Sequence, residues 1–332
     1  MSSHSTFAKV LRPLFSILLF LLLTLFMPGH PRQVYCAEEF PSKEIKLVVP
    51  FGVGGGVDLS ARIFADKVGK VLSVPMVVTN NAAGAGVVAT VGVAKAKPDG
   101  YTLLYAVNGI LITKPILTPE VPYRLADFTA ICQTLEMPVG LWVQSSAPWK
   151  NLKEFVDYAK NNPGKLRASV AIAGAGLHVA TDLFKTDAGI NAVDIPTSGG
   201  SAQTTALMGG HAEFCIDMIS TGIGYMRAGR LRALAFTRKV SEFPAIKTFD
   251  EEGYPMRIQQ WHGVFAPKGL PEPLLSKLAK AFEKVCNDPS TEEELLKQYI
   301  FLRYREPVEM AKFLETDWEI TLKTLKQSGL AK

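Results

Sequence analysis

The chain has few cysteines, the residues on which many metal sites and all disulfide frameworks depend. Its 332 residues include four cysteines. Cys132, Cys215 and Cys286 lie far apart, and no pair has the spacing of a metal site. We therefore expect buried free thiols at these three positions and no metal site.

The sequence also has no block of lysine and arginine with interleaved aromatic residues, the pattern typical of a nucleic-acid-binding surface. Basic residues are spread among acidic ones along amphipathic segments. The formal net charge is +5, and Lys9, Arg12 and Arg32, which contribute to it, precede residue 38. No nucleic acid partner is predicted.

Signs of catalysis are absent as well. The glycine-rich segment that begins at Gly52 is not a phosphate loop, because no Lys-Ser or Lys-Thr pair follows it. Nor is it a dinucleotide fingerprint, because Val57 stands at the third glycine position. No serine lies in a nucleophile elbow, and no other nucleophile and base are suitably arranged. We predict that the chain is not an enzyme and uses no cofactor.

The first 37 residues have the layout of a secretory signal peptide. Lys9 and Arg12 precede an apolar run, Leu14 to Met27, whose 14 residues are fewer than the roughly 20 that a spanning helix needs. Pro28 then breaks the run. We expect cleavage near Cys36 or Ala37 and a periplasmic mature protein; a lipid anchor on Cys36 and an uncleaved membrane anchor are the alternatives.

Four glycine-rich turns, each between a predicted strand and a predicted helix, are the main positive feature. Their backbone N–H groups and the positive ends of the helix dipoles are suited to hold an anion. The turns are Gly52 to Asp58, Asn81 to Gly86, Ala173 to His178 and Thr197 to Ser201.

Strands and helices alternate along the mature chain, which predicts an α/β protein with parallel sheets. Two apolar extended stretches, Phe128 to Gln144 and Gln259 to Pro267, interrupt the alternation. We interpret them as crossings between two lobes that face each other across a cleft. The predicted divisions are 1–37 for the signal peptide, 38–138 for the first part of lobe one, 139–258 for lobe two, and 259–332 for the return to lobe one.

The mature chain resembles the solute-binding proteins of tripartite tricarboxylate transporters, the TctC or Bug family. Each matching motif is weak alone, and the resemblance rests on their number and order. They include Val48-Val49-Pro50-Phe51 before Gly54 to Asp58, Pro98-Asp99-Gly100-Tyr101-Thr102, Asn162-Pro163-Gly164, Ala228-Gly229-Arg230-Leu231-Arg232, and Trp261 with Gly263 and Phe265-Ala266-Pro267.

The resemblance implies a type II-like periplasmic-binding-protein fold, or "Venus flytrap", with two crossing strands. It implies capture of a small carboxylate and delivery to a membrane permease, and a diffusing receptor of this kind is by default a monomer. Carried over from the family, the carboxylate-binding positions are Gly54, Gly55, Gly56 and Asp58 in lobe one, and Gly174, Gly176, His178, Gly199, Gly200 and Ser201 in lobe two, with Asp217 at the back of the cleft. We add Asn81, Gly84, Thr197 and Ser198 from their places in the remaining turns.

The chain departs from the family pattern at positions where side chains would bind the negative charges of the ligand. Ala82 stands where a basic residue is common, Thr197-Ser198 replaces a Tyr-Lys pair, and Ala175-Gly176-Leu177 replaces a serine pair before the histidine. Two cations and several hydroxyl donors are therefore absent. We expect a mono- or dicarboxylate with an apolar body rather than a citrate-like trianion.

Most candidate residues also have a purely structural interpretation. The glycine turns allow tight turns or close packing, with Asp58 capping a helix. His178 and Asp182 share a helical face, but no third metal ligand is evident, so a hydrogen-bonded histidine is expected. Asp217 could bind a ligand amine, anchor a water or be a buried acid. Trp261 is expected in hinge and core packing, and His262 and His211 at the surface or in turns.

Two other functions remain open at this point. The same cleft could serve a sensing subunit for two-component signalling. An exported α/β enzyme acting on a small acid would need His178 and Asp217 within about 3 Å of each other or of a shared substrate.

Overall fold

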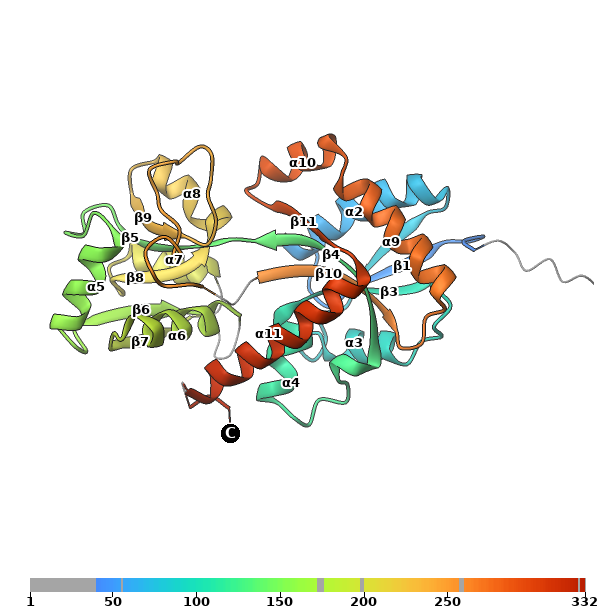
Figure 1. Ribbon diagram of the computed structural model, residues 1–332, viewed down its shortest axis with the longest axis horizontal. Helices are drawn as coiled ribbons and strands as arrows, with labels where there is room; N and C mark the ends of the chain where they lie inside the picture. The colour runs from blue at the N-terminus through green and yellow to red at the C-terminus, as the bar shows by residue number, and fades with distance from the viewer. Residues whose placement is uncertain are drawn as a thin grey trace, which may run out of the picture. The chain divides into compact units, whose positions relative to one another are not determined.

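The computed structural model describes residues 40–54, 56–171, 176–197, 200–256, 260–327 and 329–331, which contain two mixed β-sheets with helices packed on them (Figure 1). The expected signal peptide and the candidate residues Gly55, Gly174, Ser198 and Gly199 lie outside the described residues. In the described part of the chain, no helix is both long enough and apolar enough to span a bilayer.

The first sheet has the strand order β11-β4-β10-β3-β1-β2. Strand β1 is parallel to β2 and β3, whereas β10 is antiparallel to both β3 and β4. The sequence of β1 alternates in burial, with Ile45, Leu47 and Val49 facing the core. The strands are β1 (Ile45–Val49), β2 (Met76–Asn80), β3 (Thr102–Val107), β4 (Phe128–Met137), β10 (Gln260–Pro267) and β11 (Phe301–Arg305).

The second sheet has the order β7-β6-β8-β5-β9. Here β6 is parallel to β7 and β8, and β5 is antiparallel to β8 and β9. The strands are β5 (Val139–Gln144), β6 (Leu166–Val170), β7 (Ala192–Pro196), β8 (Phe214–Met218) and β9 (Leu231–Phe236).

Helices cover these sheets through apolar faces. In α2 (Gly56–Leu72), Ala61, Phe64, Ala65 and Val68 are buried at the spacing of one helical face. The other helices are α3 (Val87–Ala94), α4 (Lys114–Leu117), α5 (Leu152–Asn161), α6 (Gly176–Ala188), α7 (Gly200–Met208), α8 (Ile219–Arg227), α9 (Glu272–Cys286), α10 (Pro289–Leu296) and α11 (Pro307–Gln327), with a π-helix at Gly109–Thr113 and a 3₁₀ turn at Leu125–Asp127.

The chain passes between the sheets along extended segments. It leaves the first sheet at Met137, enters the second at Val139, and re-enters the first at Gln260. Helix α11 contributes side chains to the hydrophobic cores of both sheets. Met310, near its start, packs in the core around β3 and β10, and Leu325, near its end, packs in the core of the second sheet beside α6.

The predicted α/β alternation is confirmed, and the main differences are the following. The sheets are mixed rather than parallel, because the strands after each crossing run antiparallel to their neighbours. Helix α8 was not predicted, since Gly222 and Gly224 weaken its helical pattern. Strand β11 was not predicted either. Helix α10, which precedes it, ends at Leu296, and Tyr299 has a positive φ of 54°.

Candidate functional site

The carboxyl ends of the parallel strands in the first sheet lie at the crossing. In the antiparallel pair of β3 and β10, the last residue of β3, Val107, stands opposite His262. Gln260, two residues earlier, stands opposite Met137, the last residue of β4 before the chain enters the second sheet. Because β1 is parallel to β3, the turn after β1 lies at the same edge.

The second sheet presents its carboxyl ends to the same crossing. The last residue of β8, Met218, stands opposite Val139, the first residue of β5 after the crossing. Strand β6 is parallel to β8, so its carboxyl end is also at this edge. In open α/β sheets, ligands bind outside the carboxyl ends of the strands, where helices begin. The strand register therefore brings the carboxyl ends of the parallel strands of both sheets to the crossing.

In the first turn, the Asp58 side chain forms a hydrogen bond with the backbone of the turn itself. Asp58, 1% exposed, accepts hydrogen bonds from Gly54 N at 2.8 Å and from Asn80 Nδ2 at 2.9 Å, and forms an ion pair with Arg62 at 3.0 Å. Burial alone would raise the pKa of Asp58, but the hydrogen bonds from Arg62, Gly54 and Asn80 and the charge of Arg62 hold it below its usual value. The Asp58 carboxylate is thus satisfied within the chain.

The second turn has a clear structural role. Asn81 Oδ1 accepts a hydrogen bond from Ala83 N at 3.0 Å, which forms an Asx-turn. Gly84 and Gly86 have φ values of 59° and 85°. A Cβ on Gly86 would lie 2.7 Å from the carbonyl oxygen of Pro50 at the end of β1. Close packing of α3 against β1 therefore requires glycine at position 86.

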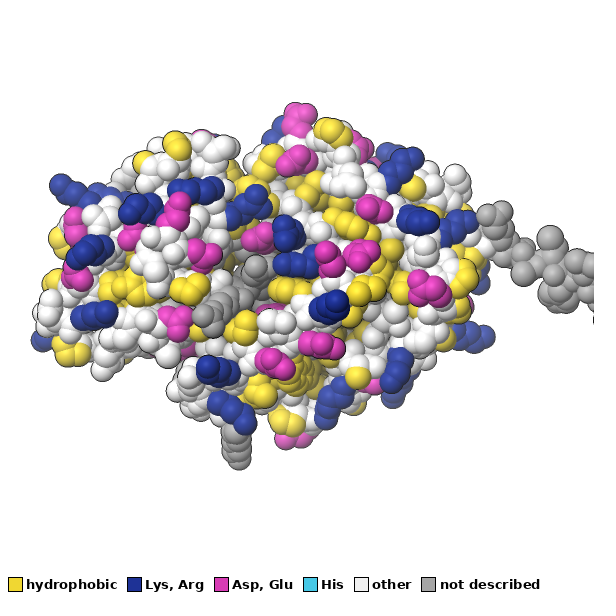
Figure 2. Space-filling view, viewed as in Figure 1, with side chains coloured by type: hydrophobic (Ala, Val, Ile, Leu, Met, Phe, Trp, Pro, Cys, Tyr) yellow, Lys and Arg dark blue, Asp and Glu magenta, His cyan; other side chains and the backbone are white. Residues whose placement is uncertain are grey.

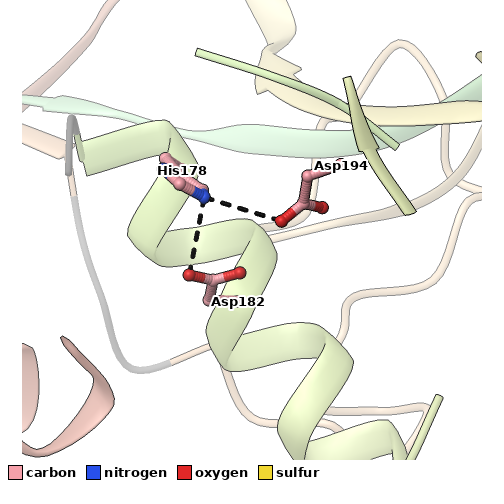
Figure 3. A group of neighbouring side chains, drawn as sticks. All are labelled: His178, Asp182 and Asp194. Atoms are coloured by element: carbon pink, nitrogen blue, oxygen red, sulfur yellow. Dashed lines mark ion pairs between the residues drawn. The ribbon is translucent and has the colours of Figure 1, made fainter. Parts of the chain in front are cut away.

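The third turn leads into α6, where His178 lies between two acids (Figure 3). His178 Nε2 is 3.6 Å from Asp182 Oδ2 and 3.7 Å from Asp194 Oδ2. The sequence predicted the pair with Asp182; Asp194 comes from β7 and was missed. The three side chains could offer ligand atoms to a metal ion.

Lys185 already bridges both carboxylates. Its Nζ is 2.8 Å from Asp182 Oδ1 and 2.7 Å from Asp194 Oδ1. Burial would raise the pKa of Asp194, but hydrogen bonds from His178 and Lys185 lower it below its usual value. The cluster borders a surface cavity of about 350 Å³ and is best described as an ion-pair network, with the hydrogen-bonded histidine that the sequence predicted. Lys185 follows Asp182 by three residues, a helical spacing that could have identified it.

Thr197, at the start of the fourth turn, and Asp217 also form hydrogen bonds within the chain. Thr197 Oγ1 donates to Val170 O at 2.9 Å, and α7 begins at Gly200 and includes Ser201. Asp217 is fully buried and accepts from Met218 N at 2.7 Å and Thr204 Oγ1 at 2.9 Å. Burial raises the pKa of Asp217 to about 6, despite these hydrogen bonds. Of the three roles considered for Asp217, the buried acid satisfied by hydrogen bonds agrees with these contacts.

His262 was expected at the surface or in a turn, and this expectation is wrong. Its ring is 4% exposed on β10, and Nδ1 lies 3.2 Å from Ser60 Oγ in α2. Burial lowers the pKa of His262 to about 4, so the ring is neutral at physiological pH. Trp261 beside it is fully buried and packs at 5.9 Å from Phe265, as expected for core packing. His211 is exposed, as expected.

Comparison with protein families identifies the family of this chain. Residues 60–330 match the model of the tripartite tricarboxylate transporter family receptor, TctC. The chain belongs to this receptor family. A UPF0065 protein of Bordetella pertussis is 32% identical over 262 residues, which cover 78% of this chain and 81% of the relative.

Solved structures agree with this family assignment. A Rhodopseudomonas palustris protein solved with adipate is 27% identical, covers 88% of this chain and 99% of its own, and superposes with a TM-score of 0.75. MatC of the same species, solved with malate, is 27% identical, covers 86% of this chain and 100% of its own, and has a TM-score of 0.70. The α/β, two-lobed binding-protein fold predicted from the sequence is confirmed, and the protein is a solute-binding receptor rather than an enzyme.

Proposed function

We propose that this receptor captures a small carboxylate between its two lobes and delivers it to the permease of a tripartite tricarboxylate-type transporter. The observation that carries the proposal is the register of the crossing strands, which brings the carboxyl ends of β1, β3, β6 and β8 to one region. Helices α2 and α6 begin there, and their first-turn N–H groups have no partner within the helix. Relatives of the same fold have been solved with adipate and malate.

The donors that we assign to the ligand are backbone groups of the glycine turns. The side chains of Asp58, Asn81, Thr197 and Asp217 are already bonded within the chain. Of the glycines in these turns, Gly54 already donates its N–H to Asp58. The proposed backbone contacts are therefore Gly55, Gly56, Gly174, Gly176, Gly199 and Gly200, with Gly84, His178, Ser198 and Ser201 as the remaining candidates.

Weak local charge favours a ligand with few negative charges. Arg62 is paired with Asp58, and Lys185 is paired with Asp182 and Asp194. On the face shown in Figure 2, basic and acidic side chains are interspersed. A mono- or dicarboxylate with an apolar body fits neutral donors better than a trianion, which needs several charge-assisted hydrogen bonds.

We further propose that residues 1–37 direct export to the periplasm and that the lobes comprise 38–138 with 259–332, and 139–258. Ligand entry would favour the closed arrangement because both lobes then contact the ligand. A monomer suffices for this function.

A thermal-shift panel of mono-, di- and tricarboxylates, amino acids and aromatic acids tests the proposal on refolded, ligand-stripped protein. At 100 times its dissociation constant, a ligand stabilises the protein by about 2.7 kcal/mol. A carboxylate that raises the Tm supports the proposal. No response to any acid by folded protein would contradict it, and citrate binding at micromolar affinity would contradict the preference for few charges.

A further inference from the structure

Gln260 places an unsatisfied amide at the beginning of α6. The side chain is 9% exposed, and its Nε2 has no hydrogen-bond partner in the described part of the chain. A Cβ on Gly176, the first residue of α6, would lie 2.5 Å from Nε2 of Gln260. Gln260 begins β10 in the first sheet, and Gly176 begins a helix on the second sheet. The Gln260 amide therefore lies at the crossing, where it contacts the other lobe.

A buried amide donor without a partner is unfavourable, because the group has lost its hydrogen bonds to water. The first N–H groups of α6 are likewise without partners inside the helix, and the positive end of the helix dipole lies there. Two independent sets of neutral donors therefore meet at one place. An oxygen of a bound ligand would satisfy both.

We propose that Gln260 is a specificity-determining residue of the binding site, which donates from Nε2 to a carboxylate oxygen of the ligand held at the N-terminus of α6. This inference rests on the proposed function. It assigns to lobe one a side chain that contacts the part of the ligand held by lobe two. The ligand oxygen then gives Gln260 its missing hydrogen bond, and this bond favours the arrangement in which Gln260 lies at the start of α6.

The neighbouring charged groups do not take over this role. Lys185 is bound by Asp182 and Asp194, and His178 lies within hydrogen-bonding or ion-pairing range of the same two acids. A carboxylate at the start of α6 is thus held by neutral donors. Removing the amide should cost affinity, and adding a negative charge should cost much more.

The test compares Gln260→Leu and Gln260→Glu with the wild type, all expressed from the full-length sequence. The probes are adipate, malate and the other acids of the thermal-shift panel, with dissociation constants measured by calorimetry for the acid that stabilises the wild type most. We expect Gln260→Leu to raise the dissociation constant about 10-fold and to keep or raise the ligand-free Tm, since an unsatisfied amide is removed. Gln260→Glu should raise the dissociation constant by about 100-fold or more, because two carboxylates would face each other.

Gln144→Leu is the matched control. Gln144 ends β5, far from the crossing, and its Nε2 donates to Leu207 O at 2.6 Å. This variant should lose stability but keep the affinity of the wild type. The monoamide of the preferred acid gives a second readout: Gln260→Glu should bind it better than the acid, since the new carboxylate can accept from its N–H group.

The two proposals fail differently. If the wild type binds an acid and both Gln260 variants bind it equally well, the role of Gln260 is overturned and the proposed function stands. A fall in Tm for Gln260→Leu with unchanged affinity would show a structural role instead. If the wild type binds no acid of the panel, the proposed function and this inference are both overturned.

Discussion

Trp261 Nε1 donates a hydrogen bond to Asp317 Oδ2 at 2.8 Å, which ties the crossing strand β10 to helix α11. Asp317 is 2% exposed, and its second oxygen, Oδ1, has no partner among the described residues. Burial raises the pKa of Asp317 to about 6, although the hydrogen bond from Trp261 and the charge of Arg305 oppose the rise. The hydrogen bond is therefore made by a carboxyl group that is costly to ionise.

Replacing Asp317 with asparagine should stabilise the protein at neutral pH. A folded pKa of about 6, above the usual 3.8, means that the neutral acid stabilises the fold below pH 3.8 and that this stabilisation is lost as the pH rises through 6. The amide oxygen introduced by Asp317→Asn would still accept from Trp261, without the charge. We expect a gain of about 1–2 kcal/mol at pH 7.5 in urea unfolding, and little gain at pH 4.5. Equal gains at both pH values would contradict the assignment. Asp317→Leu, the control, should destabilise because it leaves the indole N–H unpaired.

Gly86 should be required for folding rather than for ligand contact. Its φ is 85°, and an added Cβ would lie 2.7 Å from Pro50 O. Gly86→Ala should lower the free energy of unfolding by about 1–3 kcal/mol. Gly92→Ala, in the same region, is the control, because a Cβ there meets nothing within 4 Å and alanine favours a helix. Similar Tm values for the two variants would show that the turn tolerates a side chain.

The elements were largely predictable because their signals are local. A few neighbouring residues suffice to predict strand β1, whose burial alternates in the structure, and the glycine turns. The antiparallel partners of β10 could not be predicted from the sequence, since they depend on which strands, distant along the chain, lie next to each other in the sheet. The site shows the same limit. His178 and Asp182 share a helical face, whereas Asp194 joins them only because β7 lies beside β6, and Gln260 meets Gly176 only through the crossing.

Lys185 should determine whether the cluster around His178 binds a metal ion. In the wild type its ammonium lies within 2.8 Å of both Asp182 and Asp194. We expect a large molar excess of Zn²⁺ to leave the wild-type Tm unchanged, and EDTA to have no effect. Lys185→Gln should lose about 3 kcal/mol of stability, because two acids are left without their cation. Zn²⁺ should restore part of that loss. A rise in the wild-type Tm with Zn²⁺ would instead identify the cluster as a metal site.

Leu325 should hold α11 to the second lobe. Its side chain is fully buried in the core of the second sheet, whereas Met310 of the same helix lies in a core of the first. Leu325→Ala should lower the free energy of unfolding by about 2–5 kcal/mol. Because α11 contacts α6, hydrogen exchange should accelerate in α6 more than in α2. Leu330→Ala, at a position 37% exposed, should change stability by no more than about 0.5 kcal/mol. Uniform acceleration across both sheets in Leu325→Ala would instead mean that Leu325 supports the whole fold rather than the attachment of α11 to the second lobe.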